Sequence, residues 1–517
     1  MNKKTELPVY RYIYTLLSTI GRIALTVITS VIVPNALGPK SMGIIAYGQV
    51  IAQNLRGLFD LNLSSTFFNL SSEKEQSGSI TRILVKIILI QVIVSVIILT
   101  TLFFTKYGNN FIKGISYHIL LILLLIEWFL YLTNLSNQIG DSKSVSKWPQ
   151  LLILFSNLLM TILLIALNFI HKLNLESYLI VTMLFGLLNL ISIIYYLYTK
   201  HHDQIWKKIE ETNIKNFIKV ASKVSLPLTL ASYYTMSIDF LERYIIQYKY
   251  GAEEQSYYYI ALKWTGIVII LISSSLQIFW QALVKKFSDG DIRGASKLYL
   301  RIDSIGFYLV LTFAIIWSFL GKALLSILLG KDFANAGSLL VVMSFYPISQ
   351  VFGQMGTTIA IASGRSKIYL KSTLITSTIG LLISYILLMP KNAVIPGMGL
   401  GSLGLAIKTA IYGLFATQLI SFLNCQYFSI SYFKLLLNKI KITLVLVLIL
   451  YMCSFLLELL LPFNESIYSL AIKAILFFTL SGILLFKQPV FCGITKQDID
   501  KILENRLLTK IIGYIKK

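Results

Sequence analysis

Long apolar stretches separated by short polar segments fill most of the chain. A helix needs about 20 apolar residues to span the hydrocarbon core of a bilayer, and these stretches reach that length. The strands of a membrane barrel are about half as long and alternate in polarity, which these stretches do not. The pattern predicts an all-α polytopic membrane protein with about fourteen transmembrane helices, near residues 12–33, 42–62, 83–105, 114–137, 148–170, 177–198, 221–247, 257–283, 299–320, 336–362, 370–389, 400–424, 442–462 and 466–486.

The composition agrees with this interpretation. Of the 517 residues, 56% are hydrophobic and 13% are charged, whereas soluble domains have about 45–50% and about 25%. The mean hydropathy is +0.74. These values exclude a soluble globular, a disordered and a coiled-coil protein. Every predicted outer loop is short, so we expect no enzyme acting outside the membrane and no catalytic residues.

The net charge of +23 comes from 46 lysines and arginines against 23 acidic residues. In a soluble protein such an excess would indicate a nucleic-acid partner. Here about four times as many basic residues fall in alternate loops as in the intervening ones, and Lys439 is assigned to one of these richer loops. Because cytoplasmic loops carry the excess of Lys and Arg, this bias places both termini in the cytoplasm. We expect the basic residues to contact membrane lipids, and we expect no nucleic-acid partner.

Signatures of metal, cofactor or ATP chemistry are not found in the sequence. The cysteines Cys425, Cys453 and Cys492 have no CxxC spacing, and the four histidines have no metal-ligand spacing. The GxxxxGK[ST] pattern that cradles nucleotide phosphates does not occur. We therefore predict no metal site and no cofactor.

A faint internal repeat indicates the domain organisation. The segment ALGPKSMGIIAY, which starts at Ala36, can be aligned with KYGAEEQSYYYI, which starts at Lys249. Two parallel six-helix halves with a binding site between them are a known plan of transporters. We predict pseudo-symmetric bundles at 1–200 and 221–425, a cytoplasmic linker at 201–220, two additional helices within 426–487 and a cytoplasmic tail at 488–517.

Four cations inside predicted spans are candidates for substrate binding. A charge at the centre of a membrane helix costs about 2.5–3.5 kcal/mol on insertion scales, so such charges tend to face a partner or a hydrated cavity. Guanidinium groups bind phosphate oxygens in a two-pronged manner and keep their charge. We therefore predict a hydrated cavity that binds a diphosphate through Arg22, Arg56, Arg243 and Lys263. Lys408 and Lys473 are isolated in the sequence and are expected to extend their amines toward the interface.

Ion pairing within one helix is the alternative role for some of these cations. Arg56 with Asp60, and Asp239 with Arg243, have the i,i+4 spacing at which helical side chains meet. Each pair could be a structural bridge or part of the site. Arg22 has no acidic residue within one helical turn, which makes it the strongest single candidate.

Three carboxylates inside spans could bind H⁺ or Na⁺ and couple its gradient to transport. They are Asp239, Glu242 and Glu127. For Asp239 and Glu242, charge balance of Arg243 is the slightly favoured alternative.

Two motifs resemble those of a known family. The segment ALGPKSMGIIAYGQ followed by LFDLNLS, and the run Glu242-Arg243-Tyr244-Ile245-Ile246 followed by Gly251, are similar to bacterial O-antigen and capsule repeat-unit flippases. These polysaccharide biosynthesis proteins belong to the multidrug/oligosaccharidyl-lipid/polysaccharide exporter (MOP) superfamily. This chain has Glu242 where the family usually has Asp, Asn62 where it usually has Gly, and Ser256 where Gly is usual in the second repeat.

The resemblance implies a V-shaped pair of six-helix bundles that opens alternately to each side of the bacterial inner membrane. It implies a cargo of undecaprenyl-diphosphate-linked oligosaccharide, as in lipopolysaccharide or capsule assembly, and a polysaccharide polymerase machinery as partner. A lipid II-type flippase stays open as an alternative. A multidrug or cation efflux transporter is disfavoured by the four cations, and an O-antigen polymerase or ligase by the short outer loops.

Overall fold

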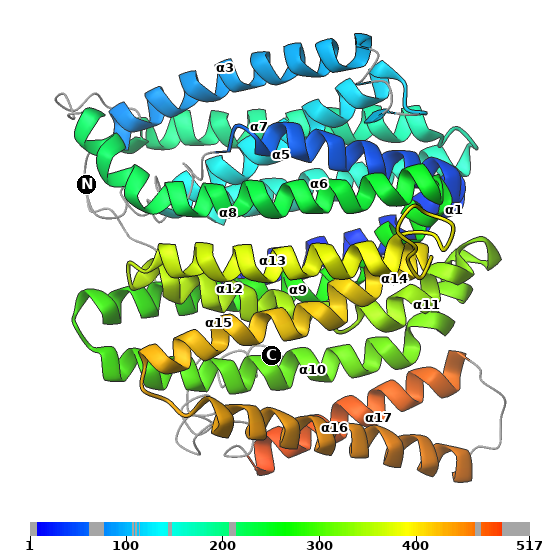
Figure 1. Cartoon of the computed structure of the whole chain (residues 1–517). Helices are drawn as coiled ribbons and strands as arrows, with labels where there is room; N and C mark the ends of the chain where they lie inside the picture. Colours follow the sequence, from blue (N-terminus) through cyan, green and yellow to red (C-terminus); the bar gives the residue numbers. More distant parts are fainter. Residues whose placement is uncertain are drawn as a thin grey trace, which may run out of the picture. The chain divides into compact units, whose positions relative to one another are not determined.

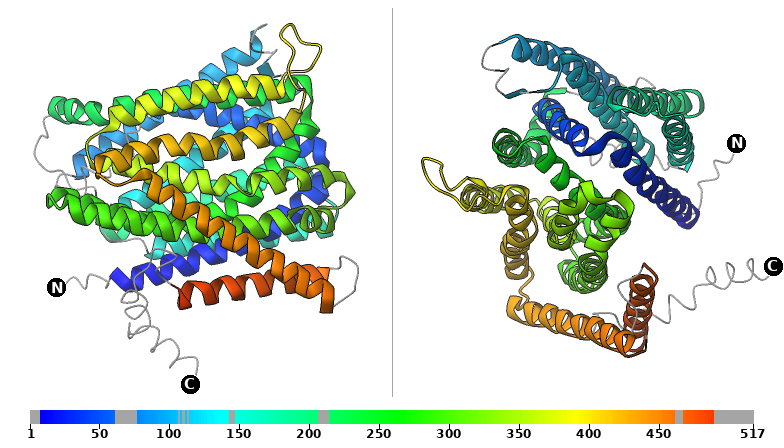
Figure 2. Two further views of the ribbon diagram at one scale, coloured as in Figure 1. Left: turned by 60° about the horizontal axis from the view of Figure 1, so that its bottom comes forward. Right: turned by 90° about the vertical axis from the view of Figure 1, so that its right-hand side faces the viewer.

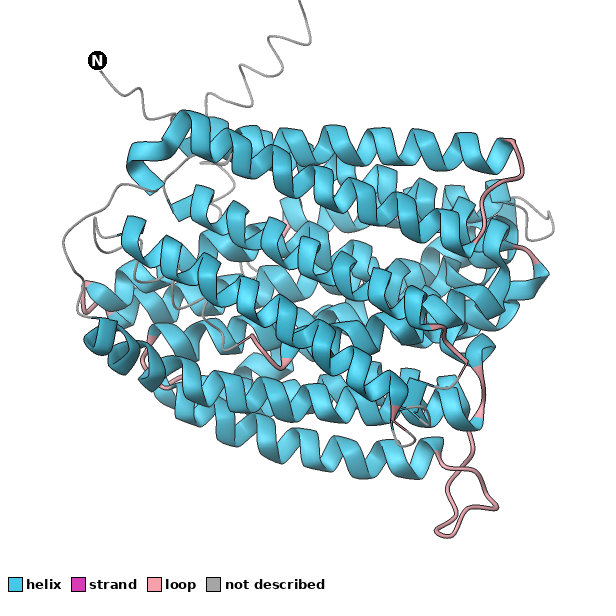
Figure 3. Ribbon diagram, turned by 90° about the horizontal axis from the view of Figure 1, so that it is seen from above, coloured by secondary structure: helices cyan, strands magenta, loops and turns pink. Residues whose placement is uncertain are grey.

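The computed structural model describes residues 8–60, 77–105, 108, 111–112, 114–142, 147–205, 214–460 and 467–488. Within these ranges the chain is helical, with no β-strand (Figures 1 and 3). The helices are α1 (Pro8–Gly57), α3 (Ser77–Phe104), α5 (Tyr117–Ser142), α6 (Lys147–Phe169), α7 (Leu175–Ile205), α8 (Ile214–Lys249), α9 (Ala252–Ser288), α10 (Ile292–Leu329), η1 (Lys331–Phe333), α11 (Ala334–Met343), α12 (Tyr346–Ala362), α13 (Ser366–Leu388), α14 (Gly401–Ile407), η2 (Lys408–Tyr412), α15 (Gly413–Tyr427), α16 (Tyr432–Leu460) and α17 (Ile467–Lys487).

Within the described residues, each predicted apolar run coincides with helical structure, but two runs are divided between several helices. The first two runs hold as two helices within α1, which are separated by a kink at Gly38, where φ is 74° and ψ is 168°. The run 336–362 is divided between η1–α11 and α12, which meet at a bend of 46°. The run 400–424 passes through α14, the π-helix η2 and α15.

The predicted count of fourteen membrane helices is not confirmed. In the part of the chain that the structure describes, nine helices are long and apolar enough to cross a membrane, or ten if the bent pair is one span. The helices α8 and α9 are not among these nine. The chain is nevertheless an all-α polytopic membrane protein.

The structure divides into two compact units, neither of which is continuous in sequence. Unit 1 comprises Met1–Leu271, Leu325–Leu339 and Gly364–Lys408, and unit 2 comprises the remaining segments. The predicted domain limits at residues 200, 220, 425 and 487 therefore stay predictions.

Unit 1 is held by pairs of helices that lie side by side. In it α5 packs on α7, α1 on α6, and α8 on α13 (Figure 1). The contact between α1 and the start of α9 is very close: a Cβ atom on Gly43 would lie 1.8 Å from the carbonyl oxygen of Ala252. Only glycine allows this approach between α1 and α9.

Unit 2 has an apolar core to which both C-terminal helices are attached. Phe352 of α12, Leu446 of α16 and Phe477 of α17 belong to this core, together with residues of α10. The Tyr308 hydroxyl of α10 donates a hydrogen bond of 2.6 Å to the carbonyl oxygen of Ser481 in α17. Figure 2 shows α16 and α17 from two further directions. Thus α10 contacts both additional helices.

Candidate functional site: charged groups within the membrane helices

Glu127 of α5 is buried, with 6% of the residue exposed, and it is held by two amides of α1. Nε2 of Gln49 and Nε2 of Gln53 donate to the same oxygen, Oε1 of Glu127, over 3.0 and 3.2 Å. The two glutamines are four residues apart, so they share one helix face. Among the described residues, no lysine or arginine lies within ion-pair distance of Glu127. This carboxylate therefore has hydrogen-bond donors but no direct counter-charge.

Arg56 lies about one turn after Gln53 on α1 and has an acidic partner. Its Nη1 lies 3.4 Å from Oδ2 of Asp60, so the i,i+4 pair is present. The guanidinium carbon also lies 4.9 Å from the ring centroid of Tyr131, a cation–π geometry. Tyr131 follows Glu127 by one turn of α5, so Arg56 and Glu127 occupy neighbouring positions in unit 1.

Glu242 of α8 has a partner that is distant in the sequence. Nζ of Lys408 lies 2.6 Å from Oε1 of Glu242, and the Ser384 hydroxyl donates to the same oxygen over 2.5 Å. These three residues, which we call the Glu242 cluster, come from α8, the π-helix η2 and α13. The expectation that Lys408 is isolated is wrong. Neither Ser384 nor Lys408 was predicted as a partner, because nothing local in the sequence connects them with Glu242.

The Arg243 side chain contacts other residues than its neighbour Glu242 does. Its Nε lies 3.6 Å from Oδ1 of Asp239, and its guanidinium carbon lies 4.0 Å from the ring centroid of Tyr258 in α9. The Arg243 side chain is 6% exposed and that of Asp239 is 53% exposed. Of the two acidic residues expected to balance Arg243, Asp239 makes the contact and Glu242 does not.

Arg22 and Lys263 are the two predicted cations without an acidic partner within the described ranges. Nη2 of Arg22 donates to the Thr19 hydroxyl over 3.2 Å, and its buried Nε has no hydrogen-bond partner. Lys263 is partly buried on α9, one turn after Tyr259, and makes no hydrogen bond or ion pair there. Both side chains keep donors that an anionic ligand could use.

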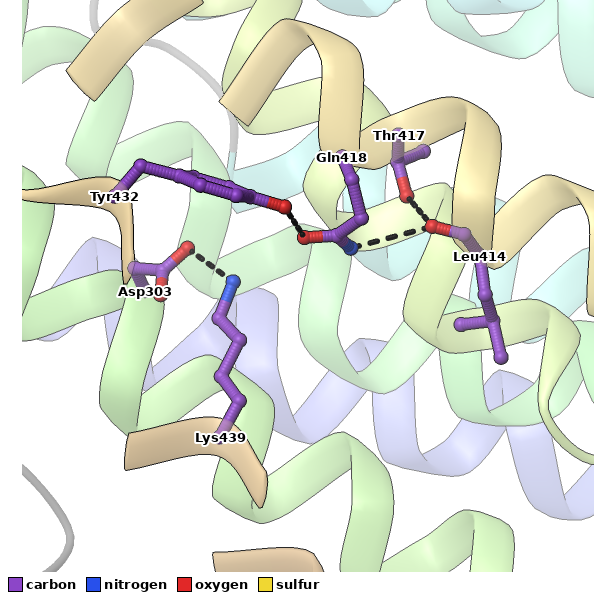
Figure 4. A network of polar contacts seen from close by, with 6 residues as sticks. All are labelled: Asp303, Leu414, Thr417, Gln418, Tyr432 and Lys439. Atoms are coloured by element: carbon purple, nitrogen blue, oxygen red, sulfur yellow. Dashed lines mark hydrogen bonds and ion pairs between the residues drawn. The ribbon is translucent and has the colours of Figure 1, made fainter. Parts of the chain in front are cut away.

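A buried ion pair in unit 2 was not predicted. Nζ of Lys439 in α16 lies 3.0 Å from Oδ1 of Asp303 in α10 (Figure 4), and the ammonium lies 3.9 Å from the ring centroid of Phe352. In the same view the Tyr432 hydroxyl donates to Oε1 of Gln418 over 3.2 Å. The assignment of Lys439 to a loop is wrong, because it lies inside α16 and is 5% exposed.

Groups of three or more His, Cys, Asp or Glu residues that could hold a metal ion are not present among the residues that the structure describes. The buried acidic residues are instead matched with amides, hydroxyls or lysines. The arrangement can therefore bind an anion at Arg22 or Lys263, and it could take up a cation at Glu127.

Comparisons with known proteins identify the fold. No family model matches the chain. The capsular polysaccharide biosynthesis protein CapF of Staphylococcus aureus is 33% identical over 129 residues, which are 24% of this chain and 32% of that protein. The match thus spans about a third of the relative's length.

Solved structures are similar over most of the chain. The lipid II flippase MurJ, in an inward closed conformation, has a TM-score of 0.60 at 18% identity, covering 92% of this chain and 99% of MurJ. An outward-facing multidrug resistance MATE family transporter of the MOP superfamily has a TM-score of 0.59 at 15% identity, covering 81% and 95%. A MOP superfamily transporter from Pyrococcus furiosus Vc1 has a TM-score of 0.58 at 14% identity, again covering 81% and 95%.

The chain therefore has the fold of the flippases and transporters of the MOP superfamily. It is a multi-pass membrane protein, and a segment of 129 residues is similar to part of a capsular polysaccharide biosynthesis protein. The resemblance predicted from its motifs is confirmed at this level.

Proposed function

We propose that this chain is a flippase that moves undecaprenyl-diphosphate-linked oligosaccharide units across the bacterial cytoplasmic membrane by alternating access. The observation that carries the proposal is the state of the four candidate cations. Arg56 and Arg243 have acidic partners, whereas Arg22 and Lys263 have none within the described ranges. An uncompensated charge inside a membrane protein is expensive unless a ligand or water meets it. A diphosphate supplies two negative groups of the required kind.

The roles of the four cations then differ. Arg22 and Lys263 bind the diphosphate directly, Arg22 through the two-pronged geometry of its guanidinium. Arg56 and Arg243, which are already paired with Asp60 and Asp239, exchange these acids for phosphate oxygens only at a later point of the transport cycle. The polyprenyl tail stays in the lipid, and the sugars pass with the diphosphate.

Transport of labelled cargo in reconstituted vesicles tests this proposal. We expect Arg22→Ala to abolish the movement of an undecaprenyl-diphosphate oligosaccharide between leaflets, while Arg22→Lys, which keeps the positive charge, retains part of it. Both variants should insert and elute like the unmodified protein. Undiminished transport by correctly folded Arg22→Ala would refute the proposal.

A lipid II-type flippase is the second candidate, because MurJ is similar over 92% of this chain. Both cargoes present a polyprenyl diphosphate, so the same cations would serve either. Competition in the vesicle assay distinguishes them: excess lipid II should compete poorly with a capsule-type oligosaccharide. An efflux transporter for cationic drugs is disfavoured, because Arg22 and Lys263, whose charges meet no acidic residue within the described ranges, would repel such cargo.

We further propose that an ion gradient drives transport and that Glu127 binds the coupling H⁺ or Na⁺. Glu242 contacts an ammonium at 2.6 Å and Asp239 a guanidinium at 3.6 Å. Among the residues that the structure describes, Glu127 has only the amides of Gln49 and Gln53 as partners. A carboxylate without a direct counter-charge is the best placed to exchange a cation. In vesicles, Glu127→Gln should remove the stimulation of transport by a gradient, while Asp239→Asn and Glu242→Gln should keep it. Unchanged stimulation in Glu127→Gln would contradict this assignment.

The setting proposed for this activity is the inner membrane, with both termini in the cytoplasm and a polysaccharide polymerase machinery receiving the flipped units. The chain acts as a transporter rather than as an enzyme. Cysteine-accessibility labelling of Lys3 and Lys517, each replaced by Cys, tests the orientation of the termini. Labelling of either position from outside intact cells would contradict it.

A further inference from the structure

The connection between α13 and α14, residues 389–400, carries apolar side chains directed away from the protein. Val394 is 103% exposed, Ile395 is 64% exposed and Met398 is 51% exposed. We call these three residues the apolar tip. Single exposed apolar residues are ordinary on protein surfaces, but three within five positions, one of them fully exposed, form a local patch.

The backbone of this connection is held in place, so the apolar tip cannot simply turn inward. The amides of Met398, Gly399 and Leu400 donate hydrogen bonds of 2.7, 2.9 and 2.9 Å to carbonyl oxygens near the end of α13. The Tyr385 hydroxyl donates to the carbonyl oxygen of Ile395 over 3.2 Å. The connection therefore presents the apolar tip as a fixed feature of unit 1.

The position of the connection places it at the membrane surface. The helices on either side, Ser366–Leu388 and Gly401–Tyr427, are both long and apolar enough to span the bilayer. In the view along the helix axes, the connection extends sideways beyond α13 and α14 instead of covering their ends (right panel of Figure 2). Figure 3 shows the same projection from above. Because the helices on either side are able to span the bilayer, we expect lipid headgroups in that direction.

The charge of the segment also fits a lipid surface. Lys391 is the only charged residue between Met389 and Leu400, and it is exposed. A basic residue beside exposed apolar side chains is the combination that binds the boundary between headgroups and acyl chains. In water, the apolar tip would have no favourable contact.

We propose that the apolar tip inserts into the headgroup–acyl boundary of the leaflet next to the α13–α14 connection and anchors unit 1 to that leaflet. This inference needs only the membrane location of the chain. It therefore stands or fails independently of the proposed cargo.

The test measures the environment of a fluorescent label on the full-length protein in lipid nanodiscs that contain anionic lipid. The NBD fluorophore is attached to Val394→Cys or Met398→Cys, in a background carrying Cys492→Ala. Asn392→Cys, an exposed polar position of the same connection, is the matched control. A lipid carrying a shallow doxyl group reports lipid contact, and iodide reports water contact.

We expect doxyl lipid to quench the labels at Val394 and Met398 about twofold or more above the label at Asn392, and iodide to show the opposite order. Equal quenching by doxyl lipid at all three positions would overturn the proposal. Labels on the apolar tip that are shielded from both quenchers would also overturn it, because a protein contact would then cover the tip. Two apolar positions are labelled so that failure of one variant to fold leaves the other to decide.

Discussion

The Glu242 cluster allows a quantitative prediction, because removing Lys408 leaves a buried carboxylate without its counter-charge. The Glu242 side chain is 3% exposed and that of Lys408 is 18% exposed, with the charges 2.6 Å apart. Breaking a buried pair by deleting one partner destabilises proteins by about 3–5 kcal/mol. The Ser384 hydroxyl offsets only part of this loss, since it donates a single hydrogen bond. We expect Lys408→Met to reduce stability by about 3 kcal/mol, which lowers the melting temperature by several degrees.

The assay is thermal unfolding of the purified full-length protein in detergent, followed by size-exclusion chromatography of the remaining folded fraction. Lys263→Met is the matched control: it deletes the same charge from a helix position that has no acidic partner in the described part of the chain, and it should not lower the melting temperature. The double variant Lys408→Met/Glu242→Gln removes both charges of the pair. It should be more stable than Lys408→Met alone, with a coupling energy of about 2 kcal/mol. A melting temperature of Lys408→Met equal to that of the unmodified protein would refute the reasoning.

Two further predictions use the same measurement. Gly43→Ala should destabilise the protein by about 1–3 kcal/mol, because the added Cβ would lie 1.8 Å from the Ala252 carbonyl oxygen. Gly266→Ala is the control: its added Cβ meets no atom within 4 Å, so this variant should be neutral or slightly stabilising. Equal melting temperatures of these two variants would contradict the close approach of α1 and α9. Asp303→Asn should reduce stability by about 3–5 kcal/mol, because it leaves the Lys439 ammonium buried and unpaired. The loss of stability should be smaller in the double variant Asp303→Asn/Lys439→Met. A double variant less stable than Asp303→Asn alone would contradict the ion pair between Asp303 and Lys439.

Much of the helical structure could be predicted from the sequence, because an apolar run of spanning length is a local property. Local chemistry also gave the i,i+4 pairs Arg56–Asp60 and Asp239–Arg243, both present in the structure. The two helices on either side of Gly38 were also predicted, and non-helical backbone separates them there. Breaks inside a single apolar run were not predicted, such as the bend of 46° between α11 and α12.

Partners distant in the sequence could not be predicted. Glu242 with Lys408, and Asp303 with Lys439, are brought together by helix packing, and no spacing rule connects residues on separate helices. A cation without an acidic residue near it in the sequence can therefore have an acidic partner on another helix or lack one, as Lys408 and Lys263 show. Lys408 meets an acid on another helix, and Lys263 meets none within the described ranges.

The central claim is that Arg22 and Lys263, which have no acidic partner among the described residues, bind a diphosphate. Equilibrium binding of undecaprenyl diphosphate to the purified protein, without any gradient, tests this most directly. Charge-assisted hydrogen bonds contribute about 1.5–3 kcal/mol each, so Arg22→Gln and Lys263→Gln should each weaken binding by about tenfold or more. Lys473 is a cation of α17 that lies over the Phe319 ring, and Lys473→Gln should leave binding unchanged. Wild-type affinity in both Arg22→Gln and Lys263→Gln would contradict the account.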